Sequence, residues 1–114
     1  MPKDDYFAIV YKILEYLYSC MRNGEPVDIE KIRWDSKAID INQSYWEDII
    51  RNMYEEGYIR DVFLINAINL PKPAIKFGNL SITQKGIEYL QDNSKMQKAA
   101  GVVKTVAEIL KMFI

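Results

Sequence analysis

Apolar residues near the amino terminus recur at helical spacing. Between Asp4 and Met21 they return every three or four positions, which predicts a helix with a broad buried face. The residues of this face are Tyr6, Phe7, Ile9, Val10, Ile13, Leu14, Leu17, Cys20 and Met21. The pair Asn23-Gly24, reinforced by Pro26, is typical of the end of a helix.

The following segment predicts a short strand and then a brief helix. We expect an extended piece around Val27 and place Asp28 at the N-cap of the brief helix. Residues 35–42 then form a connection. The apolar anchors of the brief helix and the connection are Ile29, Ile32, Trp34, Ile39 and Ile41.

A second long helix is predicted from Ser44 to Gly57. Ser44-Tyr45-Trp46-Glu47 has the spacing of a capping box, in which the Ser44 hydroxyl and the Glu47 carboxylate each accept a hydrogen bond from the other residue's amide. Gly57 is expected to end the helix. Its predicted buried residues are Trp46, Ile49, Ile50 and Met53.

After Gly57 the hydrophobic period changes from that of a helix to that of a strand. Residues 58–65 alternate, with Ile59, Asp61, Phe63 and Ile65 on one face. A loop with Pro71 and Pro73 follows, and residues 75–82 form the returning strand of a hairpin. Thr83 is then expected to cap a helix over residues 84–91, with Ile87 and Leu90 facing inward, and Asn93-Ser94 to break it.

This order of elements predicts an α+β fold of the winged helix-turn-helix type. A three-helix core would carry a β-hairpin wing, and additional carboxyl-terminal helices would follow it. We divide the chain into a winged-helix domain over residues 1–94 and a terminal amphipathic helix over residues 95–114.

The terminal helix has an apolar seam with three- and four-residue spacing. The seam residues are Met96, Ala99, Val103, Val106, Leu110 and Phe113. Residues 1–94 carry 11 basic and 15 acidic side chains, whereas residues 95–114 carry 4 basic and 1 acidic. Three interpretations stay open: a homodimer formed through this seam, packing on the same domain, or binding to an anionic membrane or a partner's groove.

The residue inventory excludes several kinds of chemistry. The chain has no histidine, so nucleophilic catalysis with an imidazole base and histidine-based zinc sites are excluded. The single cysteine, Cys20, is interpreted as a core residue. The 5 isolated glycines form no phosphate-binding loop. We therefore expect no enzyme activity, no catalytic residues, no metal, no cofactor and no small-molecule substrate.

Three stretches together resemble a known family. They are Lys3-Asp4-Asp5-Tyr6-Phe7-Ala8-Ile9-Val10-Tyr11-Lys12-Ile13-Leu14, the segment from Tyr45-Trp46 to Glu56-Gly57-Tyr58-Ile59, and Ile82-Thr83-Gln84-Lys85-Gly86-Ile87-Glu88-Tyr89-Leu90. The sequence is similar to the YjcQ-like family of small winged-helix proteins from Gram-positive bacteria, prophages and phages. The resemblance covers most of residues 3–94. It implies the winged-helix fold and a phage or prophage setting, and it names no activity.

Charge bears on whether such a wing would bind DNA. Residues 44–56 carry one basic and four acidic side chains, a net charge of −3, which a phosphate backbone repels. The wing adds few cations. The candidate DNA or partner surface consists of Gln43, Tyr45, Asp48, Arg51, Asn52, Lys72 and Lys76.

Two functions from different classes follow. The first is a DNA-binding or regulatory module of phage or prophage type, by analogy with the fold. The second is a protein–protein interaction module whose acidic helix binds a host or phage protein, as an inhibitor or a minor virion component. With a polar, acidic start and no long apolar run, we expect a cytoplasmic protein of the bacterial host, without a secretory signal or a membrane span.

Overall fold

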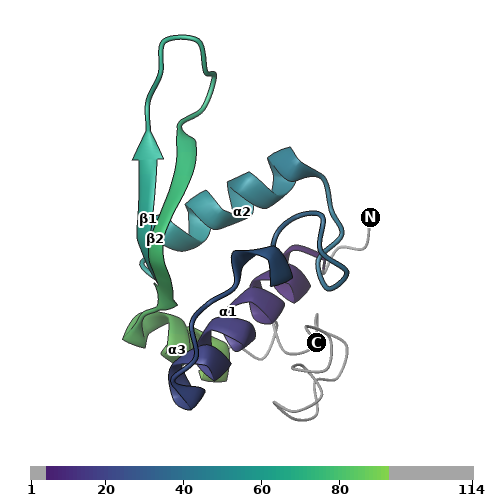
Figure 1. Ribbon diagram of the computed structural model, residues 1–114, viewed down its shortest axis with the longest axis vertical. Helices are drawn as coiled ribbons and strands as arrows, with labels where there is room; N and C mark the ends of the chain where they lie inside the picture. Colours follow the sequence, from purple (N-terminus) through teal and green to yellow (C-terminus); the bar gives the residue numbers. More distant parts are fainter. Residues whose placement is uncertain (1–4, 93–114) are drawn as a thin grey trace.

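The computed structural model describes residues 5–92 of the 114-residue chain. The elements are α1 (Asp5–Asn23), the 3-10 helix η1 (Ile29–Lys31), α2 (Gln43–Glu55), β1 (Ile59–Ile65), β2 (Ala74–Ile82) and α3 (Gln84–Asp92). Within these residues, three α-helices and a two-stranded antiparallel hairpin make an α+β fold whose layout is compatible with a winged helix (Figure 1). The predicted terminal helix over 95–114, its dimer seam and the Asn93-Ser94 break lie outside the described residues.

Helix α1 is the centre of the packing and contacts α2, α3 and β2. Most of its predicted apolar face is buried, and Ile13 and Leu14 are completely inaccessible to solvent. The exceptions are Tyr6 and Phe7, which are half-buried, and Met21, which is 46% exposed at the end of the helix, so its assignment to the buried face is wrong. The helix ends as expected at Gly24, whose φ of 66° is a left-handed conformation that glycine adopts without a steric penalty. The Glu25 amide then donates to the Cys20 carbonyl at 2.9 Å, which satisfies one of the helix's last acceptors.

The predicted strand around Val27 is wrong, because β1 and β2 are the paired strands of the described chain. The Asp28 amide donates instead to the Tyr16 hydroxyl at 2.9 Å, and this bond holds the segment on α1. Asp28 is the predicted N-cap, and its carboxylate accepts from the Glu30 amide. The brief helix is the single turn η1, with Ile32 buried at its end and Trp34 beyond it.

Helix α2 has the predicted buried face, formed by Trp46, Ile49, Ile50 and Met53. The predicted capping box at Ser44 is wrong, because Asn42 is the N-cap. The Asn42 side-chain oxygen accepts from the Ser44 and Tyr45 amides at 2.8 and 3.2 Å, so the helix already begins before Ser44. Gly57, with a φ of 83°, ends α2 as predicted.

The hairpin contains an irregularity that alternation alone does not predict. Arg60 pairs with Ser81 and Val62 pairs with Phe77, so Asp61 stands opposite the three residues 78–80. Asp61 has a φ of 63°, in the left-handed region. As a result Val62 turns into the core, whereas Phe63 is exposed. The predicted single face of Ile59, Asp61, Phe63 and Ile65 is therefore wrong.

The start of α3 is joined tightly to the start of β1. Thr83 is the predicted cap: its hydroxyl donates to the Gly57 carbonyl at 2.6 Å and accepts from the Gly86 amide at 3.0 Å. A Cβ atom at Gly86 would overlap with the Tyr58 carbonyl oxygen, so a glycine allows α3 to approach this closely. Leu90 of α3 is buried as predicted, and Ile87 is half-buried.

Candidate functional site

Arg51, predicted to face outward on α2, instead connects α2 to the hairpin. Its side chain is 11% exposed. The guanidinium Nε and Nη2 donate to the Pro73 carbonyl at 3.2 and 2.8 Å, and Nη1 lies 3.0 Å from the Asp48 carboxylate. All these contacts are internal, so Arg51 stabilises the position of the hairpin loop.

The second cation of this region, Lys72, is also paired. Its Nζ lies 2.8 Å from the same Asp48 oxygen. The hydrogen bond from Lys72, helped by the charge of Arg51, holds the pKa of Asp48 below its usual range. Asp48 thus pairs with one cation from α2, Arg51, and with one from the hairpin loop, Lys72. Lys76 is exposed on β2 and forms no ion pair with any residue in the described range.

Of the other predicted surface residues on α2, two are exposed and one is half-buried against the core. Gln43 is exposed and bonds to Glu47, and the Asn52 amide donates to the Tyr6 hydroxyl at 3.1 Å. Tyr45, predicted to point outward, is half-buried against the core. Burial, followed by the nearby charge of Asp5, raises the pKa of the Tyr45 phenol.

Four of the six exposed large apolar side chains of the described residues lie on the distal hairpin, and the other two are Met21 of α1 and Tyr54 of α2. The exposed fractions are 55% for Phe63, 41% for Ile65, 102% for Ile68 and 46% for Leu70. The hairpin projects beyond the helices, so helix packing does not cover this end (Figure 1). This patch was not among the surfaces predicted from the sequence. Ile68 and Leu70 in a loop, where polar residues are expected, were the available signal.

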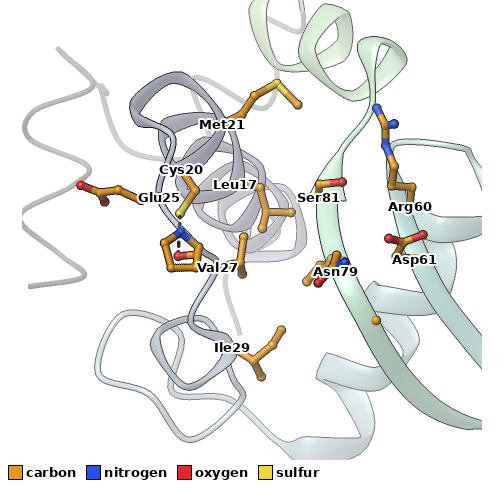
Figure 2. Close-up of a pocket in the computed structure, with 13 residues that line it drawn as sticks. Leu17, Cys20, Met21, Glu25, Val27, Ile29, Arg60, Asp61, Asn79 and Ser81 are labelled. Carbon is orange, nitrogen blue, oxygen red and sulfur yellow. Dashed lines mark hydrogen bonds between the residues drawn. The ribbon is translucent and has the colours of Figure 1, made fainter.

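A cleft of about 500 Å³ separates the segment after α1 from the edge of β2. Figure 2 shows Val27 and Ile29 on one side of it and Asn79 and Ser81 on the other. The segment around Val27 is held on α1 by the hydrogen bond from the Asp28 amide to the Tyr16 hydroxyl and does not pair with β2.

The described residues offer little reactive chemistry. Burial raises the pKa of the Cys20 thiol, which keeps it protonated and a poor nucleophile. Between Asp5 and Asp92 no three His, Cys, Asp or Glu side chains are grouped as metal ligands. None of the helices described is long and apolar enough to cross a bilayer.

Comparison with known families identifies a matching family. The family model described as "YjcQ protein" matches residues 11–109. The chain belongs to the YjcQ family. This confirms the predicted resemblance, and the match extends beyond α3 into the predicted terminal helix. Comparisons with curated proteins and with solved structures find no match.

Proposed function

We propose that this YjcQ family member is a non-enzymatic protein-recognition module that binds its partner through the distal hairpin. The observation that carries the proposal is the exposed apolar patch of Phe63, Ile65, Ile68 and Leu70. Aromatic and aliphatic side chains clustered on a projecting element are typical of the buried centre of a protein interface.

The charges around the patch support the same conclusion. Nucleic-acid affinity comes largely from cations that neutralise phosphates. Here Arg51 and Lys72 are both paired with Asp48, so they are not free for that role. The acidic side chains of α2 would repel DNA but tolerate a basic protein surface.

Site-specific crosslinking tests this function directly. A photoreactive amino acid replaces Ile68 in the full chain, and the matched control carries it at the exposed Glu88 of α3. In the cells that make the protein, we expect a discrete protein adduct from position 68 and none from position 88. The adduct should disappear in a Phe63→Ser background. Equal labelling from both positions would contradict the proposal.

Duplex DNA is the second candidate, favoured by the compatibility of the layout with a winged helix and by Lys76, which is exposed and forms no ion pair within residues 5–92. Fluorescence anisotropy with labelled duplex DNA from low to physiological salt tests it. A DNA reader should show salt-sensitive binding that Lys76→Gln weakens. Arg51→Ala is not a clean probe, because it would also release the hairpin loop from α2.

The remaining parts of the proposal concern setting and assembly. We place the protein in the cytoplasm of a phage- or prophage-bearing bacterium, as a homodimer joined through residues 95–114. Light scattering of the full chain and of a chain truncated after Ser94 tests the dimer. A full chain with the mass of one copy would contradict it.

A further inference from the structure

A second cavity, of about 210 Å³, lies where α1, α2, the turn before β1 and α3 meet. Half of the residues that line it are aromatic, with Tyr6 and Phe7 from α1, Tyr58 from the turn before β1, and Tyr89 from α3. The three segments that carry the family resemblance converge here. The cavity is larger than the roughly 150 Å³ that suffices for benzene in an engineered protein cavity.

The rings are held in two pairs. Tyr58 and Tyr89 stack with their centroids 4.3 Å apart, and Tyr6 and Phe7 meet edge to face at 5.3 Å. Burial, the largest contribution, raises the pKa of both Tyr58 and Tyr89, so these phenols are neutral at physiological pH. The wall therefore presents π-systems and neutral hydroxyl groups, which suit an apolar or cationic occupant.

The rim of the cavity is acidic. Glu56, at the end of α2, lines it and forms no ion pair with another described residue. After burial, its charge is among the contributions that raise the pKa values of Tyr58 and Tyr89. Asn52 also lines the cavity; its amide nitrogen donates to Tyr6, which leaves its oxygen as an acceptor.

A cation of the chain already lies beside this cluster. The ammonium of Lys85 lies 5.7 Å from the centroid of the Tyr58 ring. Lys85 does not line the cavity. An anionic occupant such as a phosphate would meet the Glu56 carboxylate and be repelled.

We propose that this pocket binds a cationic side chain, lysine or arginine, of a protein partner. The aliphatic stem would lie against the rings, and the charged end would reach Glu56 and the Asn52 oxygen. The inference rests on the proposed protein-recognition function and adds a second contact to it, on the helical body of the protein. Charge complementarity at the rim is the reason for choosing a cation.

The test uses two probes of nearly equal shape, Nα-acetyl-lysine methylamide, whose side-chain ammonium is free, and Nα-acetyl-norleucine methylamide. NMR signals of the tyrosine rings in the full chain are followed as each probe is added. We expect saturable shifts of Tyr58 and Tyr89 with the lysine probe, in the ~1 mM range of single-group ligands. The norleucine probe, which lacks the charge, should bind at least about threefold more weakly.

Two carboxylate variants provide matched controls. Glu56→Gln should weaken binding of the lysine probe about two- to fivefold. Glu55 is an exposed neighbour that does not line the cavity, so Glu55→Gln should leave the affinity for the probe unchanged. Equal binding of the two probes, equal effects of the two variants, or no saturable shift would each overturn the proposal. Because the assay needs no partner, its outcome is independent of crosslinking through position 68.

Discussion

The two ends of the β-hairpin are both rich in apolar residues, but they differ in how far those residues are exposed to solvent. At the near end Ile59 and Ile82 are 2% and 0% exposed, and at the far end Phe63 and Ile68 are 55% and 102% exposed. Both ends are rich in apolar residues. The difference comes from position, since the near end lies against the helices and the far end projects past them (Figure 1). Hydrophobicity therefore stabilises the fold at one end and is available for recognition at the other.

The attachments of the two ends also differ. The near end is held by close contacts with the backbone. The Thr83 hydroxyl donates to the Gly57 carbonyl, and Gly86 packs against the Tyr58 carbonyl. The far end is held to α2 by the guanidinium of Arg51 on the Pro73 carbonyl. We expect substitutions at the near end to affect global stability, and those at the far end to affect the hairpin and its partner.

The largest effect is expected from Gly86→Ala at the near end. The new methyl group would overlap with the Tyr58 carbonyl oxygen, which is backbone and cannot move aside cheaply. This strain outweighs the better helix propensity of alanine, and urea denaturation should show a loss of about 1–3 kcal/mol. Glu88→Ala on the exposed face of α3 is the control, with a change within about 0.5 kcal/mol. A more stable Gly86→Ala protein would contradict the close approach of α3.

Arg51→Met tests the attachment of the far end. The variant loses both hydrogen bonds to the Pro73 carbonyl and the ion pair with Asp48, and we expect about 1–2 kcal/mol of destabilisation. Amide exchange should accelerate in the hairpin more than in α1. Lys72→Met is the matched control, because this exposed partner of Asp48 should contribute less than about 0.5 kcal/mol. Equal losses in the two variants would show that the Pro73 contact is unimportant.

Glu15 gives a pH-dependent prediction in the helical body. It is 4% exposed, and one of its carboxylate oxygens has no hydrogen-bond partner among the residues that the structure describes. Burial raises its pKa despite the opposing charge of Arg22. Since the folded state favours the protonated form, this carboxyl lowers stability as pH rises above its unfolded pKa of about 4.3. Glu15→Gln should therefore raise the free energy of unfolding by about 1 kcal/mol at neutral pH.

The control for Glu15 is the pH profile itself. The stabilisation should disappear in acid, where Glu15 is protonated in both the folded and unfolded states. Denaturant melts of the wild type and Glu15→Gln across this range measure the difference. A variant less stable than the wild type at neutral pH would mean that a favourable partner holds Glu15 ionised.

The smallest effect is expected from Ile68→Ser at the tip of the hairpin. The side chain is fully exposed, so the free energy of unfolding, measured by thermal melts, should change by less than about 0.5 kcal/mol. The same substitution should reduce partner binding if the far end is the recognition surface. A concentration-dependent loss of stability would instead indicate that the patch is buried between copies of the chain.

The sequence was most informative where local chemistry decides the structure. Helical periodicity predicted the buried face of α2, and Gly24, Gly57 and Thr83 were correctly assigned to the ends and start of helices. It was less informative where two local solutions compete. Asn42 and Ser44 are both good N-caps, and only the path of the preceding connector decides between them.

For the candidate surface, the sequence predicted which residues of α2 are exposed better than it predicted what their side chains contact. Outward helical positions correctly included Gln43 and Asn52. Arg51 was assigned to the same surface, but its guanidinium contacts Pro73, which is 22 residues away in the sequence. No local pattern contains that contact. The aromatic pocket was missed for the same reason, because its four rings come from three separate segments.

By itself, the sequence determined the order and type of the main elements, the absence of histidine chemistry and the family, because periodicity, caps and composition are local properties. The tertiary structure decided which apolar residues of the hairpin are buried. The bulge at Asp61 reversed the faces of β1, and the reach of the helices left the distal hairpin uncovered. It also decided that Arg51 and Lys72 meet Asp48, because long-range packing brings the hairpin loop back to α2.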